Sequence, residues 1–310
     1  TGGLDPAAAP VFPAGPMTGR LAAFRLHAGL LVETELDPKA QPFLFDHRID
    51  GTAVLPGVMG IEAFAEAAVA LLPGFRVSSV EDVDFLAPFK LYRDEPRSVV
   101  VEAVLRPTGD AVEAECRLVG RRVLPGQAEP QETVHFRGRV RLDRGEASTE
   151  AFAAALERPG AAIAVSEIYS VYFHGPAYQV LEGAWKNGSG VVGLFADPLP
   201  PNHIPDAPTV VAPRLVELAF QTAGVYELGT AGRMGLPLRV ERVRPLRPLE
   251  TGAGRLHAVV TPSISGDGSF DARVVDADGN VHLVVEGYRT VELPGGAPAD
   301  RLAPFRDAMA

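Results

Sequence analysis

The sequence predicts an α+β fold in which one unit, a long helix packed on an antiparallel sheet, occurs twice. Three observations lead to this prediction: two long helical patterns, two sets of strand patterns, and short segments that recur in the same order. The chain of 310 residues also exceeds what one ordinary core holds, so two similar halves are expected from length alone.

The first unit begins with a strand and continues with a long helix. Apolar and polar residues alternate over 27–36, which predicts the strand. A helix is expected over 56–72, because Pro56 suits a first turn and apolar residues then recur at helical spacing up to Leu72. Further strands are expected at 77–91, 98–106, 111–123 and 133–142.

The second unit repeats this pattern after an alanine-rich, charged stretch at 146–164, which we interpret as a linker with a short helix. A strand-rich region is expected to start at Ile168. The second long helix is predicted from Pro213 to Leu228, where Gly229 would end it. The strands that follow are expected at 238–246, 255–263, 270–276 and 281–293.

Short sequence matches between the halves favour a duplication. The matching pairs are 80–89 with 240–249, 61–63 with 216–218, and 134–136 with 281–283. Each match is short, but their shared order supports a repeat. We therefore divide the chain into an N-terminal linker at 1–19, a first unit at 20–145, a linker at 146–165, a second unit at 166–294 and a C-terminal linker at 295–310.

Composition narrows the function classes. The formal net charge of -10 argues against nucleic-acid binding, which needs an excess of basic residues on at least one face. No apolar run reaches the roughly 18 residues that span a membrane, so we expect a soluble, cytoplasmic protein. The single Cys116 excludes an internal disulfide and is expected to be an inert thiol. The chain starts at Thr1 without a signal-type segment, and we expect a piece of a larger polypeptide.

A histidine lies just before the first helix, in a setting suited to proton transfer. His47 is followed by Gly51 and then by Pro56 and Gly57, which open the helix. The helix start can bind a partial negative charge, and histidine can act as a base near neutral pH. This arrangement indicates proton chemistry beside a carbonyl group. Gly51 and Pro56 would also fix the turn and the helix start in a purely structural role.

The second helix carries a carboxylate among apolar residues. Glu217 lies in a stretch that is apolar on nearly every side, so we expect burial to raise the pKa of Glu217 and keep it protonated. Gln221 lies four residues on, on the same helix face, and could hold the carboxyl in place. The pattern alone fits a narrow solvated strip equally well.

Three motifs together resemble the dehydratase domains of polyketide synthases, whose fold is a double hotdog. The matches are His47, Gly51 and Pro56 in H-x-x-x-G-x-x-x-x-P, Tyr172-Phe173-His174-Gly175-Pro176 in Y-x-Y-G-P, and Glu217 and Gln221 in D-x-x-x-Q. They occur in family order, and the resemblance covers about residues 20–294. The sequences of the two helices most resemble those in dehydratases of iterative synthases, such as the synthases that make polyunsaturated fatty acids or enediynes.

The sequence departs from the family pattern at three positions. Glu217 stands where most of these dehydratases have aspartate, and His174 replaces the second tyrosine of its motif. Ala212 replaces a histidine that often begins the third motif, so no role of that histidine is carried over.

The resemblance implies that water is eliminated from a 3-hydroxyacyl thioester to give an enoyl thioester. Neutral His47 would remove the proton next to the thioester carbonyl, and protonated Glu217 would give a proton to the departing hydroxyl. The backbone N–H of Gly57 would donate to the carbonyl oxygen. No metal and no resident cofactor is implied, because the substrate is carried on the phosphopantetheine arm of an acyl carrier protein.

Other residues receive supporting or structural roles. Tyr172 would point its hydroxyl at the site or pack in the core, while Gly175 and Pro176 are expected to form a turn. Glu62 is the first-half equivalent of Glu217, but no glycine follows His203 at the spacing that a mirror site requires. We therefore expect one active site lined by both halves. Structural roles are expected for His27, His135, His257 and His282.

Two other functions share this fold. A product-template-like cyclase or an enoyl isomerase would also use a histidine and a carboxylate, and a cyclase would need a wide chamber. A non-catalytic hotdog scaffold would need neither His47 nor Glu217. The partners expected are an acyl carrier protein, other domains of the parent synthase and a second copy in a homodimer. A basic docking patch is one interpretation of Arg239, Arg242, Arg244 and Arg247, and an ordinary solvated face is the other.

Overall fold

The computed structural model describes residues 15–25, 29–70, 72–122, 130–153, 156, 162–203, 207–247 and 254–310. The strands of the first half are β1 (Arg20–Arg25), β2 (Gly29–Leu36), β5 (Arg76–Phe85), β7 (Arg97–Thr108), β8 (Ala111–Arg122) and β9 (Gln131–Asp143). Those of the second half are β10 (Ile163–Ala164), β11 (Leu181–Asn187), β12 (Gly190–Phe195), β13 (Gly235–Pro245), β14 (His257–Pro262), β15 (Phe270–Val275) and β16 (Val281–Glu292).

Two long helices, α2 (Gly57–Val69) and α4 (Pro213–Ala231), lie on this sheet. The smaller elements are α1 (Pro42–Phe45), β3 (Arg48–Ile49), β4 (Thr52–Val54), β6 (Lys90–Leu91), η2 (Tyr92–Asp94), α3 (Val165–Ile168), η3 (Pro176–Tyr178), η4 (Ala299–Arg301) and α5 (Ala303–Met309). Within the described ranges, no helix is both long and apolar enough to cross a membrane.

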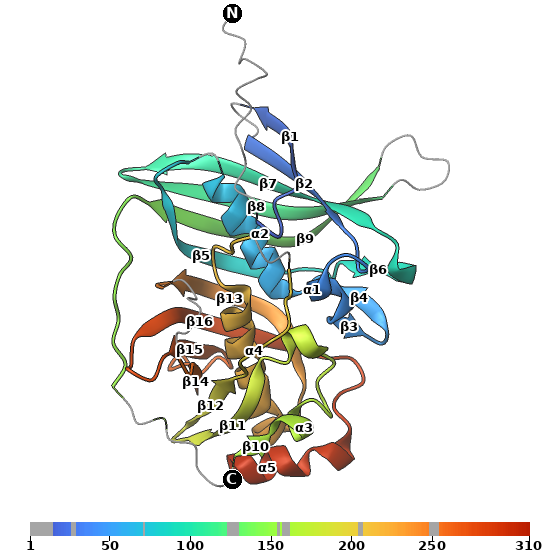
Figure 1. Ribbon diagram of the computed structural model, residues 1–310, viewed down its shortest axis with the longest axis vertical. Coiled ribbons are helices and arrows are strands. Elements are labelled where there is room, and N and C mark those ends of the chain that lie inside the picture. The colour runs from blue at the N-terminus through green and yellow to red at the C-terminus, as the bar shows by residue number, and fades with distance from the viewer. Residues whose placement is uncertain are drawn as a thin grey trace, which may run out of the picture.

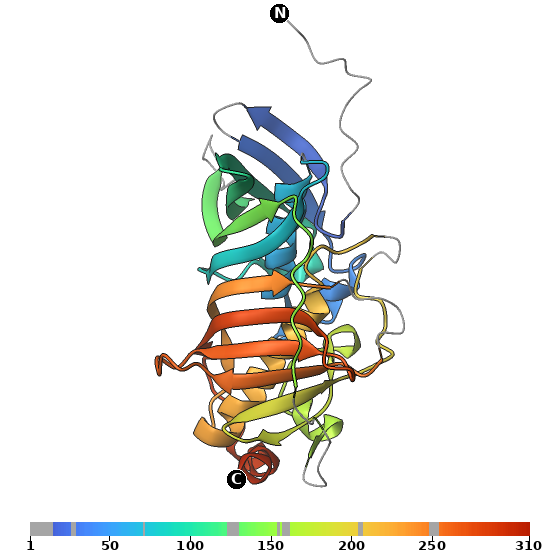
Figure 2. The same ribbon diagram turned by 90° about the vertical axis from the view of Figure 1, so that its left-hand side faces the viewer.

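All strands of the main sheet pair in the order β1-β2-β7-β8-β9-β5-β13-β16-β15-β14-β12-β11-β10. The first half supplies β1 to β5 of this order, and the second half supplies β13 to β10 (Figure 1). Figure 2 shows the strands of the two units following one another down the molecule, with both helices behind them. The predicted α+β class, with one helix on an antiparallel sheet in each half, is confirmed.

The two units are joined by the antiparallel pairing of β5 with β13. Val80 lies opposite Val243, and Val83 lies opposite Val240. These strands contain the segments that match in sequence, so each copy pairs with the other as two identical protomers do across a twofold axis. The turns that follow are also equivalent: the carbonyl of His135 accepts from Leu86 N–H at 2.8 Å, and that of His282 accepts from Leu246 N–H at 2.9 Å.

Several expected element ends are corrected. The strand expected at 77–91 divides into β5 and β6, because the N–H groups of Leu86 and Ala87 both turn to the His135 carbonyl. The region expected to be strand-rich from Ile168 begins instead with α3, whose first turn is closed by the Glu167 carboxylate accepting the Ala164 N–H at 3.1 Å. The short helix expected within 146–164 does not occur in the part of that stretch which the structure describes.

Helix α4 continues past the expected end at Gly229. It ends at Ala231, and the C-cap Gly232 has a φ of 66°, a left-handed conformation that glycine adopts most easily. Gly229 instead lies against α5, where an added Cβ would overlap Met309. The absence of a side chain at Gly229 therefore allows α4 and α5 to pack closely.

The described parts of the two expected terminal linkers are packed against the rest of the chain. Leu302, Phe305 and Met309 are at most 7% exposed and place one face of α5 against α4. At the other end, Met17 is 1% exposed. The alanine and proline content of these two segments is typical of a linker. Each segment nevertheless contains a few large apolar residues that pack against the rest of the chain. Residues 1–14 lie outside the described residues.

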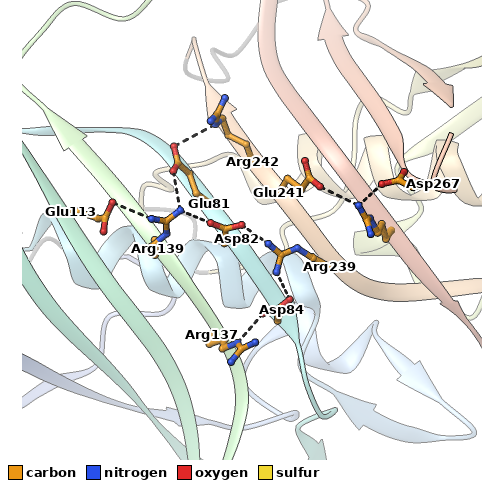
Figure 3. A network of polar contacts seen from close by, with 11 residues as sticks. Glu81, Asp82, Asp84, Glu113, Arg137, Arg139, Arg239, Glu241, Arg242 and Asp267 are labelled. Atoms are coloured by element: carbon orange, nitrogen blue, oxygen red, sulfur yellow. Dashed lines mark hydrogen bonds and ion pairs between the residues drawn. The ribbon is translucent and has the colours of Figure 1, made fainter. Parts of the chain in front are cut away.

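Three arginines of β13 pair with acidic side chains. Arg239 pairs with Asp84 at 2.7 Å and with Asp82, while Arg242 pairs with Glu81 at 3.4 Å and with Glu286 at 3.3 Å. Figure 3 shows this network extending across β5 to arginines of β9. Arg244 pairs with Glu150. The positive charge of these three arginines is thus balanced by carboxylates where β5 meets β13, which favours the interpretation as an ordinary solvated face over that of a basic patch.

Two buried glutamates on α2 connect the helix to distant segments. Glu62 is fully buried and accepts the backbone N–H groups of Val210 and Val211, at 2.5 and 2.9 Å, just before α4. Glu66 accepts the Met17 N–H at 3.0 Å and the Thr18 hydroxyl at 2.5 Å. Burial raises the pKa of Glu62 to about 7, and burial together with the Glu62 charge raises the pKa of Glu66 to about 9.

The raised pKa values predict that Glu66→Gln stabilises the protein increasingly as pH rises. A carboxyl with a raised pKa in the folded state contributes fully to stability below its unfolded pKa of 4.5, and this contribution is lost as pH rises toward about 9. Glutamine imitates the protonated side chain at every pH. Between pH 5 and 9 the variant should gain at least about 1 kcal/mol over the wild type in urea unfolding.

The exposed Glu132→Gln serves as the matched control for this prediction. Glu132 lies at the outer end of β9, and its replacement should change stability by less than about 0.5 kcal/mol at any pH in the range. Equal pH dependence of the wild type and Glu66→Gln would contradict the predicted effect.

Candidate active site

His47 is held by a tight hairpin formed by β3 and β4. Asp50 and Gly51 make the turn with φ values of 50° and 75°, as a two-residue hairpin turn of this type requires. The Val54 N–H donates to the His47 carbonyl at 3.0 Å, and the His47 Nδ1 lies 2.8 Å from the Val54 carbonyl oxygen. A carbonyl can only accept, so Nδ1 carries the hydrogen and Nε2 has a free lone pair.

The His47 ring is neutral near pH 7. His47 is 8% exposed. Burial and the neighbouring His174 lower the pKa of His47 to about 4, although the charge of Glu217 acts in the opposite direction. A neutral ring with a free Nε2 can accept a proton. The structure thus gives His47 the state that a general base requires.

The segment that contains Gly175 and Pro176 is attached to the His47 hairpin. His174 forms a β-bridge with His47, and the Gly175 N–H donates to the Asp46 carbonyl at 2.7 Å. A Cβ at Gly175 would lie 2.5 Å from the Asp46 carboxylate, so glycine is required by this close approach. Pro176 then begins η3. These two residues therefore form the expected turn, and it carries His174 to the site.

Glu217 lies on α4 with one oxygen held by two side chains. Its Oε1 accepts from Gln221 Nε2 at 2.9 Å and lies 3.2 Å from His174 Nε2. Burial favours a higher pKa, but the His174 hydrogen bond and the nearby histidines outweigh it and lower the pKa of Glu217. The expectation that burial keeps Glu217 protonated is therefore wrong, because the helix pattern does not reveal the contact with His174.

Gln221 connects Glu217 to three tyrosines. Its Oε1 accepts the Tyr169 hydroxyl at 2.8 Å, and its Nε2 also donates to the Tyr178 carbonyl at 2.9 Å. The Tyr172 hydroxyl donates to the Gln221 backbone carbonyl at 2.7 Å. In this structure the Tyr172 hydroxyl thus anchors α4 and does not bond to His47.

A cavity of about 330 Å³ lies where the two units meet. His47 and Gly57 line it from the first unit, and Glu217 lines it from the second. Tyr172, His174 and Gln221 also contribute to its wall. Gly57 starts α2, with an extended Pro56 as the N-cap, so its N–H points away from the helix ladder. The site residues proposed from the sequence thus lie around one cavity, and His174, to which the sequence assigned no role, lies among them.

The remaining walls of the cavity are apolar. Phe220 and Tyr288 stack with ring centroids 3.8 Å apart and an interplanar angle of 5°. Leu86, Leu238 and Val291 line the cavity and are each about half exposed, which places its opening beside them. This lining suits an apolar chain that enters from solvent.

The other carboxylates, histidines and cysteine that the sequence singled out lie outside this cavity where the structure describes them. Glu62, equivalent to Glu217, is closed off by the backbone before α4. His282 pairs with Asp276 at 3.2 Å, and His135 Nδ1 lies 3.0 Å from the Ala87 carbonyl oxygen. His257 packs edge-on against Trp185. Cys116 is buried, which raises its thiol pKa above the usual range. His27 lies outside the described residues.

Family models match most of the chain. Residues 17–118 match a model described as "Polyketide synthase dehydratase domain", and residues 147–300 match one described as "Polyketide synthase dehydratase N-terminal domain". A component of the pikromycin polyketide synthase of Streptomyces venezuelae is 28% identical over 305 residues, which is 95% of this chain and 8% of that protein. A protein of the polyunsaturated fatty acid synthase of Thraustochytrium is 24% identical over 71% of the chain and 8% of that protein. The chain thus spans a small part of these relatives.

Solved structures of dehydratase domains share the fold. The domain from the CurF module of the Curacin polyketide synthase superposes with a TM-score of 0.74 at 20% identity, covering 90% of this chain and all of that one. The CurK dehydratase gives a TM-score of 0.71 at 19% and 18% identity for two solved mutants, with 92% and 94% of this chain and all of theirs covered. Both are described as inactive, one with an aspartate replaced and one with a histidine replaced.

Removal of the Gln221 amide should destabilise the fold. Gln221→Met leaves the Tyr178 carbonyl and the Tyr169 hydroxyl without their partner in a buried place, which costs about 1–3 kcal/mol. Urea unfolding measures this loss. Gln131→Met, at the exposed start of β9, is the matched control and should stay within about 0.5 kcal/mol of the wild type. A Gln221→Met variant as stable as the wild type would show that these bonds contribute little.

Proposed function

Since the chain belongs to the polyketide synthase dehydratase family, we propose that it eliminates water from a 3-hydroxyacyl thioester carried on an acyl carrier protein. The observation that carries this proposal is one cavity lined by a neutral histidine from the first unit and a carboxyl group from the second. The two groups provide a base and an acid on either side of a bound chain.

His47 acts as the base in this proposal. Its Nε2 takes the proton from the carbon next to the thioester carbonyl, while Nδ1 keeps its hydrogen bond to Val54 at 2.8 Å. That bond fixes the ring orientation and becomes stronger when the ring gains charge. The hairpin turn at Gly51 therefore serves the reaction by holding the base in place.

Glu217 acts as the acid. The electron pair left by the proton forms the new carbon–carbon double bond, and the bond from the third carbon to the hydroxyl oxygen breaks. The hydroxyl takes a proton from the Glu217 carboxyl and leaves as water. Gln221 Nε2, at 2.9 Å from Oε1, keeps the carboxyl oriented during this step.

The thioester carbonyl gains negative charge as the proton is removed. The Gly57 N–H at the start of α2 is the donor we propose for this oxygen, since unbonded amides and the helix dipole both favour negative charge there. A Cβ at this position would lie 2.8 Å from the Phe85 ring, so the cavity is tight around this donor.

Two variants of a structurally similar dehydratase also support the roles proposed for His47 and Glu217. The CurK dehydratase is described as inactive when one histidine or one aspartate is replaced, and we assign the corresponding roles to His47 and Glu217. The volume of about 330 Å³ lies at the small end of the roughly 300–1,000 Å³ of ligand sites, which favours a narrow acyl chain over the wide chamber that a cyclase needs.

Removal of either group should abolish most of the activity. With a synthetic 3-hydroxyacyl thioester of pantetheine or of a carrier protein, the wild type should release water, detected as a mass loss in the acyl group. His47→Ala and Glu217→Gln should each lower kcat/KM by about 10²–10⁴-fold, which is the usual contribution of acid–base groups.

Controls of the same chemical type lie outside the cavity. His257→Gln and Glu241→Gln should retain kcat/KM within about twofold, because their side chains face other parts of the fold. Undiminished turnover of His47→Ala and Glu217→Gln would exclude the proposed site. No turnover by the folded wild type with several chain lengths would exclude the proposed substrate class.

A further inference from the structure

His174 is a buried titratable residue that the proposed reaction has not used. It occupies the position of the second tyrosine in its motif, and its side chain is 8% exposed. Nε2 lies 3.2 Å from Glu217 Oε1, while the buried Nδ1 has no hydrogen-bond partner among the described residues. The ring therefore faces the acid group, and the contact with Glu217 is the one polar contact of its nitrogens among the described residues.

The position of His174 is fixed on several sides. The ring stacks on Phe173 with centroids 4.4 Å apart, and Tyr172 contacts its edge at 5.7 Å. Its backbone is bridged to His47, and its carbonyl accepts Gln179 Nε2 at 3.1 Å. The contact with Glu217 is thus part of a rigid arrangement, not the result of a mobile surface side chain.

Among the described residues of the cavity wall, the histidines are the basic side chains near Glu217, and His174 is the one in contact with it. The described cavity wall contains no lysine or arginine, and Glu217 is its sole acidic residue. Burial lowers the pKa of His47, and the ring is neutral. Burial raises the pKa of the nearby tyrosines, so they carry no charge at neutral pH; these are Tyr169, Tyr172, Tyr178 and Tyr288. The charged groups beyond them are Asp46 after α1, and Arg214 and Glu227 on α4.

The reaction needs a proton on the acid group, although its position between two histidines favours the carboxylate. We propose that His174 and Glu217 hold this proton jointly, with His174 as a positioning residue that stores it and returns it to Glu217 during elimination. This inference rests on the proposed function. The Nε2–H bond of the doubly protonated His174 ring breaks as the carboxyl O–H bond forms, which leaves a neutral ring with its hydrogen on Nδ1. The carboxyl O–H bond then breaks as the hydroxyl leaves as water.

The proton balance closes within the site. Before elimination the proton is on the pair and His47 is neutral; afterwards the pair is deprotonated and His47 carries the proton taken from the substrate. The protein has the same total charge in both states. The His47 and His174 ring centroids are 5.4 Å apart, a distance that the product water can bridge to return the proton.

A pH profile separates this role from a structural one. His174→Tyr introduces the residue of the family motif, which can donate a hydrogen bond to Glu217 but cannot act as a cation at neutral pH. The alkaline limb of kcat/KM should move to lower pH by about one unit or more, because the acid proton is then held by Glu217 alone. His174→Phe should show the same shift and a further loss of at least about tenfold at pH 8.

The His282–Asp276 pair is a matched control. Its nitrogen–oxygen distance is also 3.2 Å, and both side chains are at most 12% exposed, yet it lies outside the cavity. His282→Tyr should leave the pH profile unchanged. A loss of activity in His174→Tyr that is uniform across pH, with an unmoved alkaline limb, would overturn the proposal and leave a packing role.

A second measurement does not depend on activity. In proteins with isotope-labelled histidine, the His174 ring signal, identified by its absence in His174→Tyr, should titrate at lower pH in Glu217→Gln than in the wild type, by about one unit or more. The same midpoint of the His174 titration in Glu217→Gln and in the wild type would contradict the proposal of a shared proton, whatever the kinetic result. If this coupling is present and the wild type dehydrates no thioester, the proposed function fails while the pair remains.

Discussion

The antiparallel pairing of β5 with β13 is the constraint on which the rest of the structure depends. It joins two sheets into one and sets α2 beside α4, so that a residue before one helix and a residue within the other reach the same cavity. Backbone hydrogen bonds give this pairing its register, and the charges flanking it are matched, with Arg239 between Asp82 and Asp84. A slip of one residue would turn Val80 and Val83 away from the core, and the cavity would lose its alignment.

Much of this arrangement follows from the sequence, for identifiable reasons. Helical stripes and alternating strands are local patterns, and the His47 motif specifies a hairpin and a helix start whose geometry depends on nearby residues alone. These features could be predicted because each depends on residues close together in the chain. The pattern of α4 left burial and a solvated strip equally open for Glu217, and the structure shows that its side chain is buried.

Features that depend on long-range partners could not be predicted in the same way. The charge of Glu217 depends on His174, 3.2 Å away in space but far away in sequence. The signal in the sequence is a histidine where the family has tyrosine, and this difference does not by itself identify Glu217 as the partner of the histidine. The pairing of the β13 arginines likewise depends on β5, and the packing of α5 depends on α4, where Gly229 leaves room for it.

The equivalent carboxylates Glu62 and Glu217 have different surroundings, and this has an evolutionary consequence. In a homodimer, every substitution appears in both protomers, so two symmetry-related sites must change together. Fusion of the two copies into one chain removes that restriction. In this chain the Glu62 carboxylate is enclosed by the backbone amides of Val210 and Val211, while the Glu217 carboxylate faces the cavity. The fold therefore preserves the symmetry of a dimer in its backbone and has lost it in its polar residues.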